Sequence, residues 1–161
     1  MAVIHLAKAG VLEEIAEVFG GAVIPKAVEV EVVEGGRRAG KPDAELVALF
    51  VKNETLKIIE IERGELYETL YGLGLGAGEL EALLLCIRNK EWLLVSNDRA
   101  TRRVAPVFNV KLATVPQAIT AAAINGGLSK QRAREAITQL KRIGWYSNEV
   151  IELALQTLEE K

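Results

Sequence analysis

Carboxylate side chains gather around one predicted helix and strand between residues 72 and 98. A helix is predicted from Glu79, because the apolar residues after it have the i, i+3, i+4, i+7 spacing of one helix face: Leu80, Leu83, Leu84 and Ile87. The apolar run 92–95 then predicts a buried strand that ends before Asp98. Sites in open α/β sheets lie just beyond the carboxyl ends of strands, so we expect Asp98 in such a site, with Glu79 and Glu81 nearby.

Oxygen ligands favour one kind of chemistry at this place. Carboxylates suit hard cations such as Mg²⁺ or Mn²⁺, and a cluster of them suits metal-assisted phosphoryl transfer. The glycines at 72–78 lack the lysine and the serine or threonine of a phosphate-binding loop, and they follow a predicted helix rather than a strand. His5 is the only histidine, which excludes sites that need two imidazoles, and we expect it to be a surface or packing residue.

Composition limits the class of protein. Half of the 161 residues are hydrophobic, which is enough for one domain with a core and a small appendage. The single cysteine, Cys86, excludes a disulfide framework and is expected in the core. The N-terminus lacks the order of a signal peptide, and no apolar run approaches the roughly 18 residues of a membrane span, so we expect a cytoplasmic protein without membrane contact. A net charge of −2 and 5% aromatic residues argue against a nucleic-acid coating protein or a base-stacking platform.

Helix and strand patterns alternate up to residue 116. Strands are predicted at 22–24, 56–61, 92–95 and 110–113, helices at 12–19, 42–50, 66–71, 79–88 and 100–107, and a glycine-rich basic loop at 35–41. This alternation predicts a mostly parallel sheet with helices on both faces. From Gln117 the pattern is purely helical, with Ser129 and Ser147 as predicted N-caps. We therefore expect an α/β domain at 1–116 and a helical C-terminal extension at 117–161.

One segment gives two conflicting signals. Valine and glutamate alternate from Val28 to Val32, and this period of two favours a half-exposed strand. Pro25, three residues earlier, suits the first turn of a helix. The proline favours a helix, and periodicity alone does not decide.

Four segments in this order resemble the PIN-domain family, in particular the branch related to toxin nucleases of type II toxin–antitoxin pairs. They are Leu6–Gly10, Val23–Val33, Gly76–Leu85 and Leu93–Ala105, and the resemblance covers nearly the whole chain. It implies a three-layer α/β/α fold around a parallel sheet. It also implies an acidic cluster at the strand ends that binds Mg²⁺ or Mn²⁺ and hydrolyses RNA, and a helix after Pro25 whose carboxylate faces this site.

The resemblance assigns the acidic residues one by one. Glu31 matches the family's helix glutamate, and Asp98 matches the aspartate after the fourth strand. Glu81 best matches the acidic position at the helix start, with Glu79 as a near alternative, although helix geometry alone does not choose between them. The resemblance thus implies a catalytic set of Glu31, Glu81 and Asp98, and metal ligands drawn from these three and Glu79.

Neighbouring side chains have implied supporting roles. Ser96 and Asn97 stand where the family has a hydroxyl residue and a polar or acidic residue. Three arginines follow Asp98 closely and are candidates for contact with the RNA backbone, although a solvated helix face would also contain them: Arg99, Arg102 and Arg103.

One departure concerns the family's first strand, which ends in an aspartate. In this chain Met1 falls after that aspartate, and the first acidic residue is Glu13, on a later predicted helix. We therefore expect the first strand to be missing, replaced or supplied by a partner, and the ribonuclease activity to be impaired. The alternative is a non-catalytic PIN-like module that binds a protein partner or RNA.

The C-terminal helices are rich in apolar residues. They include more apolar length than one small sheet covers: Leu140, Ile143, Trp145, Tyr146, Ile151 and Leu155. We expect part of this surface to be buried in a homodimer or against an antitoxin-like protein. The alternative is that these residues pack on the chain's own sheet.

Overall fold

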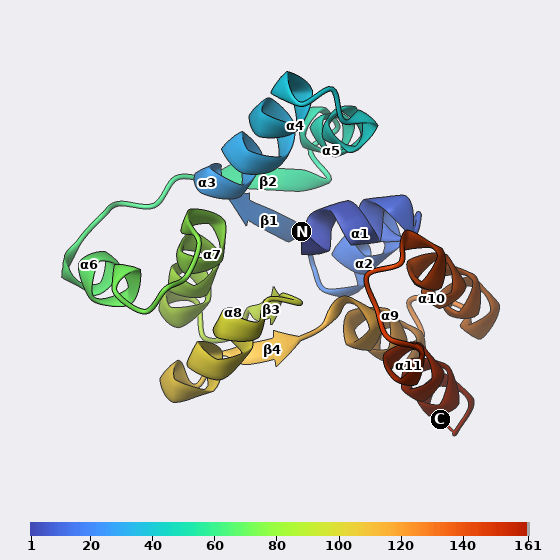
Figure 1. Ribbon diagram of the computed structural model, residues 1–161. Coiled ribbons are helices and arrows are strands. Elements are labelled where there is room, and N and C mark those ends of the chain that lie inside the picture. Colours follow the sequence, from blue (N-terminus) through green and yellow to red (C-terminus); the bar gives the residue numbers. More distant parts are fainter. Residues whose placement is uncertain (161) are drawn as a thin grey trace. The chain divides into compact units, whose positions relative to one another are not determined.

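The computed structural model describes residues 1–160 and contains both helices and strands (Figure 1). The chain forms two compact units, one of Met1–Ala22 with Thr114–Lys161 and one of Val23–Ala113. The alternation of strands and helices in the second unit confirms the predicted mixed α/β class. The predicted division into residues 1–116 and 117–161 concerns independent folding and stays a prediction.

The strands of the α/β unit are short and pair two by two. In the described residues, β1 (Ala22–Pro25) pairs with β2 (Leu56–Ile59), and β3 (Leu93–Val95) pairs with β4 (Lys111–Ala113). The second pair is parallel, with Leu94 opposite Leu112. Each predicted strand is therefore present, but the predicted sheet is divided into two pairs of three- and four-residue strands.

A helical run from residue 26 to residue 38 resolves the conflict after Pro25. It consists of α3 (Lys26–Glu29), the π-helical turn η1 (Val30–Glu34) and α4 (Gly35–Arg38), and the backbone stays helical where these pieces join. Pro25 itself is the last residue of β1 and the N-cap of α3, one position earlier than predicted. The helix prediction is confirmed, and the strand signal came from valines that alternate without forming a strand.

The predicted loop at 35–41 is wrong in its first half, because Gly35 and Gly36 belong to α4. A Cβ added at Gly36 would lie 2.8 Å from the Cβ of Ala44 on α5 (Pro42–Lys52). Gly36 therefore serves a close approach of two helices rather than a turn. Only residues 39–41 connect them without helical structure.

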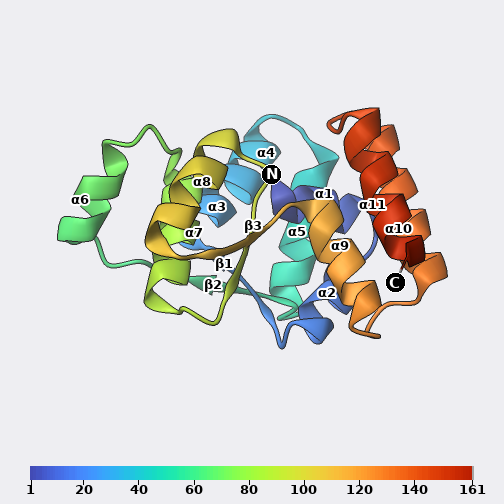
Figure 2. The ribbon, with the colours of Figure 1, turned by 90° about the horizontal axis from the view of Figure 1, so that it is seen from below.

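Three further helices build the core of this unit. They are α6 (Glu65–Tyr71), α7 (Ala77–Arg88) and α8 (Arg99–Val104), the last followed by the 3-10 turn η2 (Ala105–Phe108). The predicted apolar stripe of α7 lies in the core, with Leu80, Leu83 and Leu84 fully buried. Cys86 is buried as predicted, and burial raises the pKa of its thiol to about 11. In Figure 2, α7 and α8 lie beside β3 and β4, and α7 packs against both β3 and α8.

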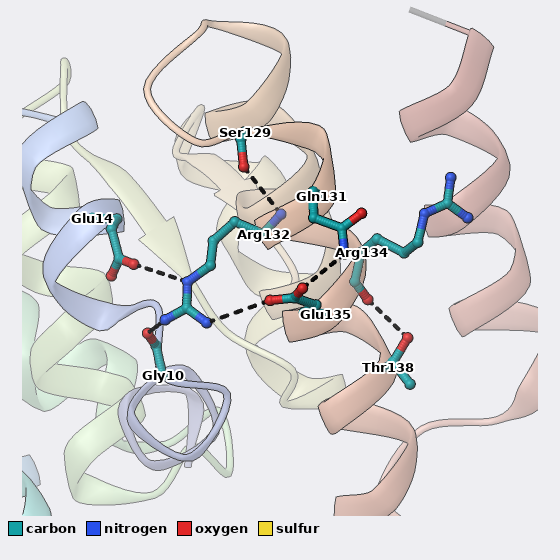
Figure 3. Close-up of polar contacts among 8 residues, drawn as sticks. All are labelled: Gly10, Glu14, Ser129, Gln131, Arg132, Arg134, Glu135 and Thr138. Carbon is teal, nitrogen blue, oxygen red and sulfur yellow. Dashed lines mark hydrogen bonds and ion pairs between the residues drawn. The ribbon is translucent and has the colours of Figure 1, made fainter.

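The other unit is entirely helical apart from Ala22. It contains α1 (Ala2–Lys8), α2 (Leu12–Val18), α9 (Val115–Ile124), α10 (Lys130–Ile143) and α11 (Asn148–Glu160). The cap prediction at Ser129 is confirmed, since its hydroxyl oxygen accepts from Arg132 N at 3.1 Å, and Ser147 accepts from Val150 N at 3.4 Å. Figure 3 shows how Arg132 ties α10 to the turn between α1 and α2: its guanidinium donates to Gly10 O and to Glu14 Oε1.

The apolar residues of the C-terminal helices are mostly used within this unit. Leu140 and Ile151 are buried, where α9, α10 and α11 pack on one another, so these two are not available to a partner. The burial of the remaining surface by a partner stays a prediction. His5 is a packing residue, as predicted, and its Nδ1 lies 2.7 Å from Tyr146 Oη. Of the residues named in the sequence analysis, Trp145 stays exposed, and Val150 and Leu153 are exposed beside it.

Candidate functional site

The contact between α3 and α7 involves the buried carboxylate of Glu81. This side chain is 7% exposed, and its Oε2 accepts a hydrogen bond from Ala27 N at 3.0 Å. The first N–H groups of any helix need an acceptor from outside the helix, and Pro25, the N-cap residue of α3, has no side-chain acceptor. Glu81 supplies it, so a predicted site residue also caps the helix that contains Glu31.

Glu31 reaches across the same contact in the opposite direction. It follows Ala27 by one helical turn, and Gly78 precedes Glu81 by one turn on α7. A Cβ built at Gly78 would lie 3.1 Å from Glu31 Oε2 and 2.9 Å from Val28 Cγ2. The carboxylates of Glu31 and Glu81 therefore both lie at the contact between α3 and α7, and their membership of one acidic set stays a prediction.

The helical turn that contains Glu31 is unusual. Residues 30–34 form a π-helical turn, in which Val32 and Val33 are both buried while Glu31 is exposed. Single π turns inside helices occur often at functional sites, because the extra residue redirects the side chains around it. This turn directs Glu31 away from the buried valines and toward α7.

Glu79 lies differently from Glu81. Its carboxylate folds back over Gly76, the N-cap residue of its own helix α7. An acidic side chain in the first turn of a helix is stabilised by the positive end of the helix dipole, which is a sufficient reason for this position. The contact with α3 thus favours Glu81 over Glu79 as the partner of Glu31.

Asp98 lies at the junction of β3 and α8, where the sequence predicted a ligand. Its Oδ2 accepts from Thr101 N at 2.6 Å, which makes it the N-cap of α8. Its own N–H donates to Ser96 Oγ at 3.1 Å, so the buried Ser96 holds the turn in which Asp98 lies. Asn97 is half-buried between them. The supporting role of Ser96 in a catalytic site stays a prediction.

The arginines after Asp98 lie on one side of α8. Arg99, Arg102 and Arg103 are exposed, and their i, i+3, i+4 spacing gives them a common face. A positive stripe of this kind suits contacts with backbone phosphates. Its role in RNA binding stays a prediction.

Carboxylate geometry limits what a cation site here would be. Among residues 1–160, no three histidine, cysteine, aspartate or glutamate side chains are gathered as the ligands of one metal ion. Two carboxylates with water as the remaining ligands are a set that Mg²⁺ accepts. A divalent cation held by Glu31 and Glu81 would therefore be mostly hydrated, and the place of Asp98 in the same site stays a prediction.

Three features of the site were missed by sequence reasoning. The helix was predicted to start at Glu79, which leaves out Gly78, although Gly78 is a buried residue of α7. The capping of α3 by Glu81 was also not foreseen, and the available signal was Pro25, a helix start without a capping side chain. Thr101 Oγ1 is buried and has no hydrogen-bond partner among residues 1–160, which no sequence pattern indicates.

Comparison with known proteins gives one family. A family model described as a PIN domain matches residues 1–160, a range that includes both compact units. The match confirms the resemblance seen in the sequence, and with it the PIN-like α/β/α fold. No curated protein and no solved structure gives a significant match. No helix within residues 1–160 is long and apolar enough to cross a membrane.

Proposed function

The chain belongs to the PIN-domain family, and from this premise we propose that it is a divalent-metal-dependent ribonuclease of low activity. The observation that supports the proposal is that Glu31 and Glu81 both have their carboxylates at the contact of α3 and α7. These two carboxylates would hold Mg²⁺ or Mn²⁺, with Asp98 as the third acidic residue of the set. A bound divalent cation supplies positive charge at the scissile phosphate and activates water for hydrolysis.

The protein's own residues would then bind and orient the RNA. Exposed guanidinium groups of Arg99, Arg102 and Arg103 would contact backbone phosphates next to Asp98. Ser96 would keep Asp98 in place through the hydrogen bond to its backbone N–H. The alignment of a phosphate by fixed contacts is itself a large part of catalysis.

We expect low activity because two of the three carboxylates already accept hydrogen bonds. Glu81 and Asp98 already accept hydrogen bonds from backbone N–H groups, which draws part of their charge away from a cation. Water replaces a missing ligand but does not fix the ion in one geometry. We therefore expect loose metal binding, with affinity in the millimolar range typical of weak oxygen-ligand sites.

Cleavage of single-stranded RNA tests the proposal. A fluorescently labelled RNA should be cut slowly with Mn²⁺ and not with chelator, and Glu31→Gln or Glu81→Gln should abolish the cleavage. Glu13→Gln, at an exposed residue of α2, is the control and should cleave like the original protein. Cleavage that continues in chelator, or that survives Glu31→Gln, would contradict the assignment.

Metal binding has a second readout in stability. Two carboxylates held together repel each other unless a cation lies between them, so millimolar Mn²⁺ should raise the melting temperature. The increase should disappear in Glu31→Gln. An unchanged melting temperature in the original protein would count against a metal site.

A non-catalytic role is the second candidate. The observation that favours it is that Glu81 and Asp98 both cap helices. This structural role is a sufficient reason for a carboxylate at each position without catalysis. In that case RNA would bind to the positive stripe of α8 without being cut. Fluorescence anisotropy with the same RNA, together with the cleavage assay, separates the two functions.

Assembly is part of the proposal. We expect a toxin-like protein that forms a homodimer or binds an antitoxin-like protein through the exposed apolar residues at its C-terminal end, where Trp145 is 59% and Leu153 65% exposed. Leu153→Glu should then dissociate the dimer without unfolding the helix. Light scattering that shows a monomer at micromolar concentration would remove the homodimer.

A further inference from the structure

Gly78 occupies a place on α7 where a side chain does not fit. Its added Cβ would lie 2.9 Å from Val28 Cγ2, 3.1 Å from Glu31 Oε2 and 3.8 Å from Val28 Cα. Carbon atoms in favourable contact are about 3.5–4.0 Å apart. A methyl group at this position would therefore displace the valine, the carboxylate or the whole of α3.

The backbone at Gly78 gives no other reason for a glycine. The residue lies in the first turn of α7 with ordinary helical geometry, and it is not among the glycines with positive φ. In a helix, glycine is less favourable than alanine. The benefit that offsets this cost is the close approach of α3.

We propose that Gly78 is a positioning residue for the Glu31 carboxylate, an inference that rests on the proposed metal site. Because α7 has no side chain here, the carboxylate lies against the helix backbone one turn before Glu81. A methyl group would take part of this space and shift the Glu31 carboxylate from its place against α7. The pair would then no longer hold one cation from two helices.

Affinity for Mn²⁺ alone, measured by electron paramagnetic resonance of the free ion, is the first test. Gly78→Ala should weaken Mn²⁺ binding about tenfold, the size of effect seen when residues that orient metal ligands are changed. Gly36→Ala is a matched control, because its new Cβ would meet Ala44 Cβ at 2.8 Å in another tight helix contact of the same unit. It should lower stability to a similar degree and leave Mn²⁺ affinity unchanged.

A second measurement needs no metal. In a double-mutant cycle of melting temperatures, Gly78→Ala should cost less in a Glu31→Ala background, because the methyl group then no longer meets the carboxylate. Val28→Ala in all four proteins removes the other close contact and keeps Gly78→Ala folded. The coupling that remains belongs to residues 78 and 31.

The outcomes separate this inference from the proposed function. If Gly78→Ala binds Mn²⁺ as tightly as the original protein, or if residues 78 and 31 show no coupling, Gly78 does not position Glu31. If the original protein binds no Mn²⁺ but the coupling is present, the proposed metal function fails and the contact between Gly78 and Glu31 stands. Both the proposed metal site and the role of Gly78 are supported if Gly78→Ala binds Mn²⁺ tenfold more weakly, residues 78 and 31 are coupled, and Gly36→Ala binds Mn²⁺ like the original protein.

Discussion

Two carboxylates of this protein cap helices in different ways. Asp98 accepts its hydrogen bond from Thr101 N, three residues further along the same segment. Glu81 accepts from Ala27 N, 54 positions earlier in the chain and on another helix. The cap of Asp98 forms with its own turn, whereas that of Glu81 forms only when α7 packs against α3. One carboxylate thus depends on local structure and the other on tertiary packing.

The largest expected effect is that of removing the Glu81 carboxylate. Glu81→Ala leaves the N–H of Ala27 without its acceptor inside a packed contact, and the free energy of unfolding should fall by about 2 kcal/mol. Glu81→Gln keeps an oxygen at the same place and should cost less than half as much. Urea denaturation measures both, and equal losses would mean that the hydrogen bond contributes little.

A smaller effect is expected for the local cap. Asp98→Ala should lower the free energy of unfolding by about 1 kcal/mol, the usual cost of losing an N-cap, and Asp98→Asn should cost only a fraction of this. An equal loss in the free energy of unfolding for Asp98→Ala and Glu81→Ala in the same urea titration would contradict the difference between a local and a tertiary cap. In that case Asp98 would have a tertiary role beyond α8.

The alkylation rate of Cys86 reports how each cap affects the packing of α7. Cys86 is buried on α7, and its raised pKa of about 11 keeps the thiol protonated at pH 8. Iodoacetamide should therefore react slowly with the folded protein. Glu81→Ala should accelerate the reaction because it loosens α7, and Asp98→Ala should change it less; equal acceleration would contradict a specific link between Glu81 and α7.

A further effect concerns alkaline pH. Because burial raises the pKa of Cys86 from its ordinary 9.0 to about 11, the folded state holds this proton more tightly than the unfolded state. The resulting contribution to stability is complete below pH 9 and is lost as the pH rises toward 11. The difference in melting temperature between the original protein and Cys86→Ala should therefore shrink over this range, and a constant difference would rule out the linkage.

Local signals explain what could be predicted from the sequence. Ser129, Pro42 and the apolar spacing of Leu80 and Leu84 act within a few residues, and each marked a helix that the structure contains. Asp98 was found in the same way, as the polar residue at the end of a strand. These elements could be predicted because the residues that define them interact with near neighbours in the sequence.

Close approaches between distant segments were beyond such signals. Gly36 was predicted in a loop and Gly78 was left outside the predicted helix, because the sequence does not distinguish a glycine that allows a close helix contact from one that forms a turn. The prediction that Glu31 and Glu81 belong to one site came from family resemblance, because no local sequence signal links the two residues. The division of the strands into two pairs likewise depends on packing that the strand patterns do not record.

The π-helical turn at 30–34 determines how far the two ends of the helical run 26–38 are rotated relative to each other. Residues before it face α7 through Ala27 and Val28, and Gly36 after it faces α5. A π turn holds one residue more than an α-helical turn. Deletion of one residue within 30–34 would therefore restore regular α-helix and rotate one end against the other by about 100°. The shortened helix could then pack against α7 or against α5, but not against both. The number of residues in this turn therefore determines whether both contacts form.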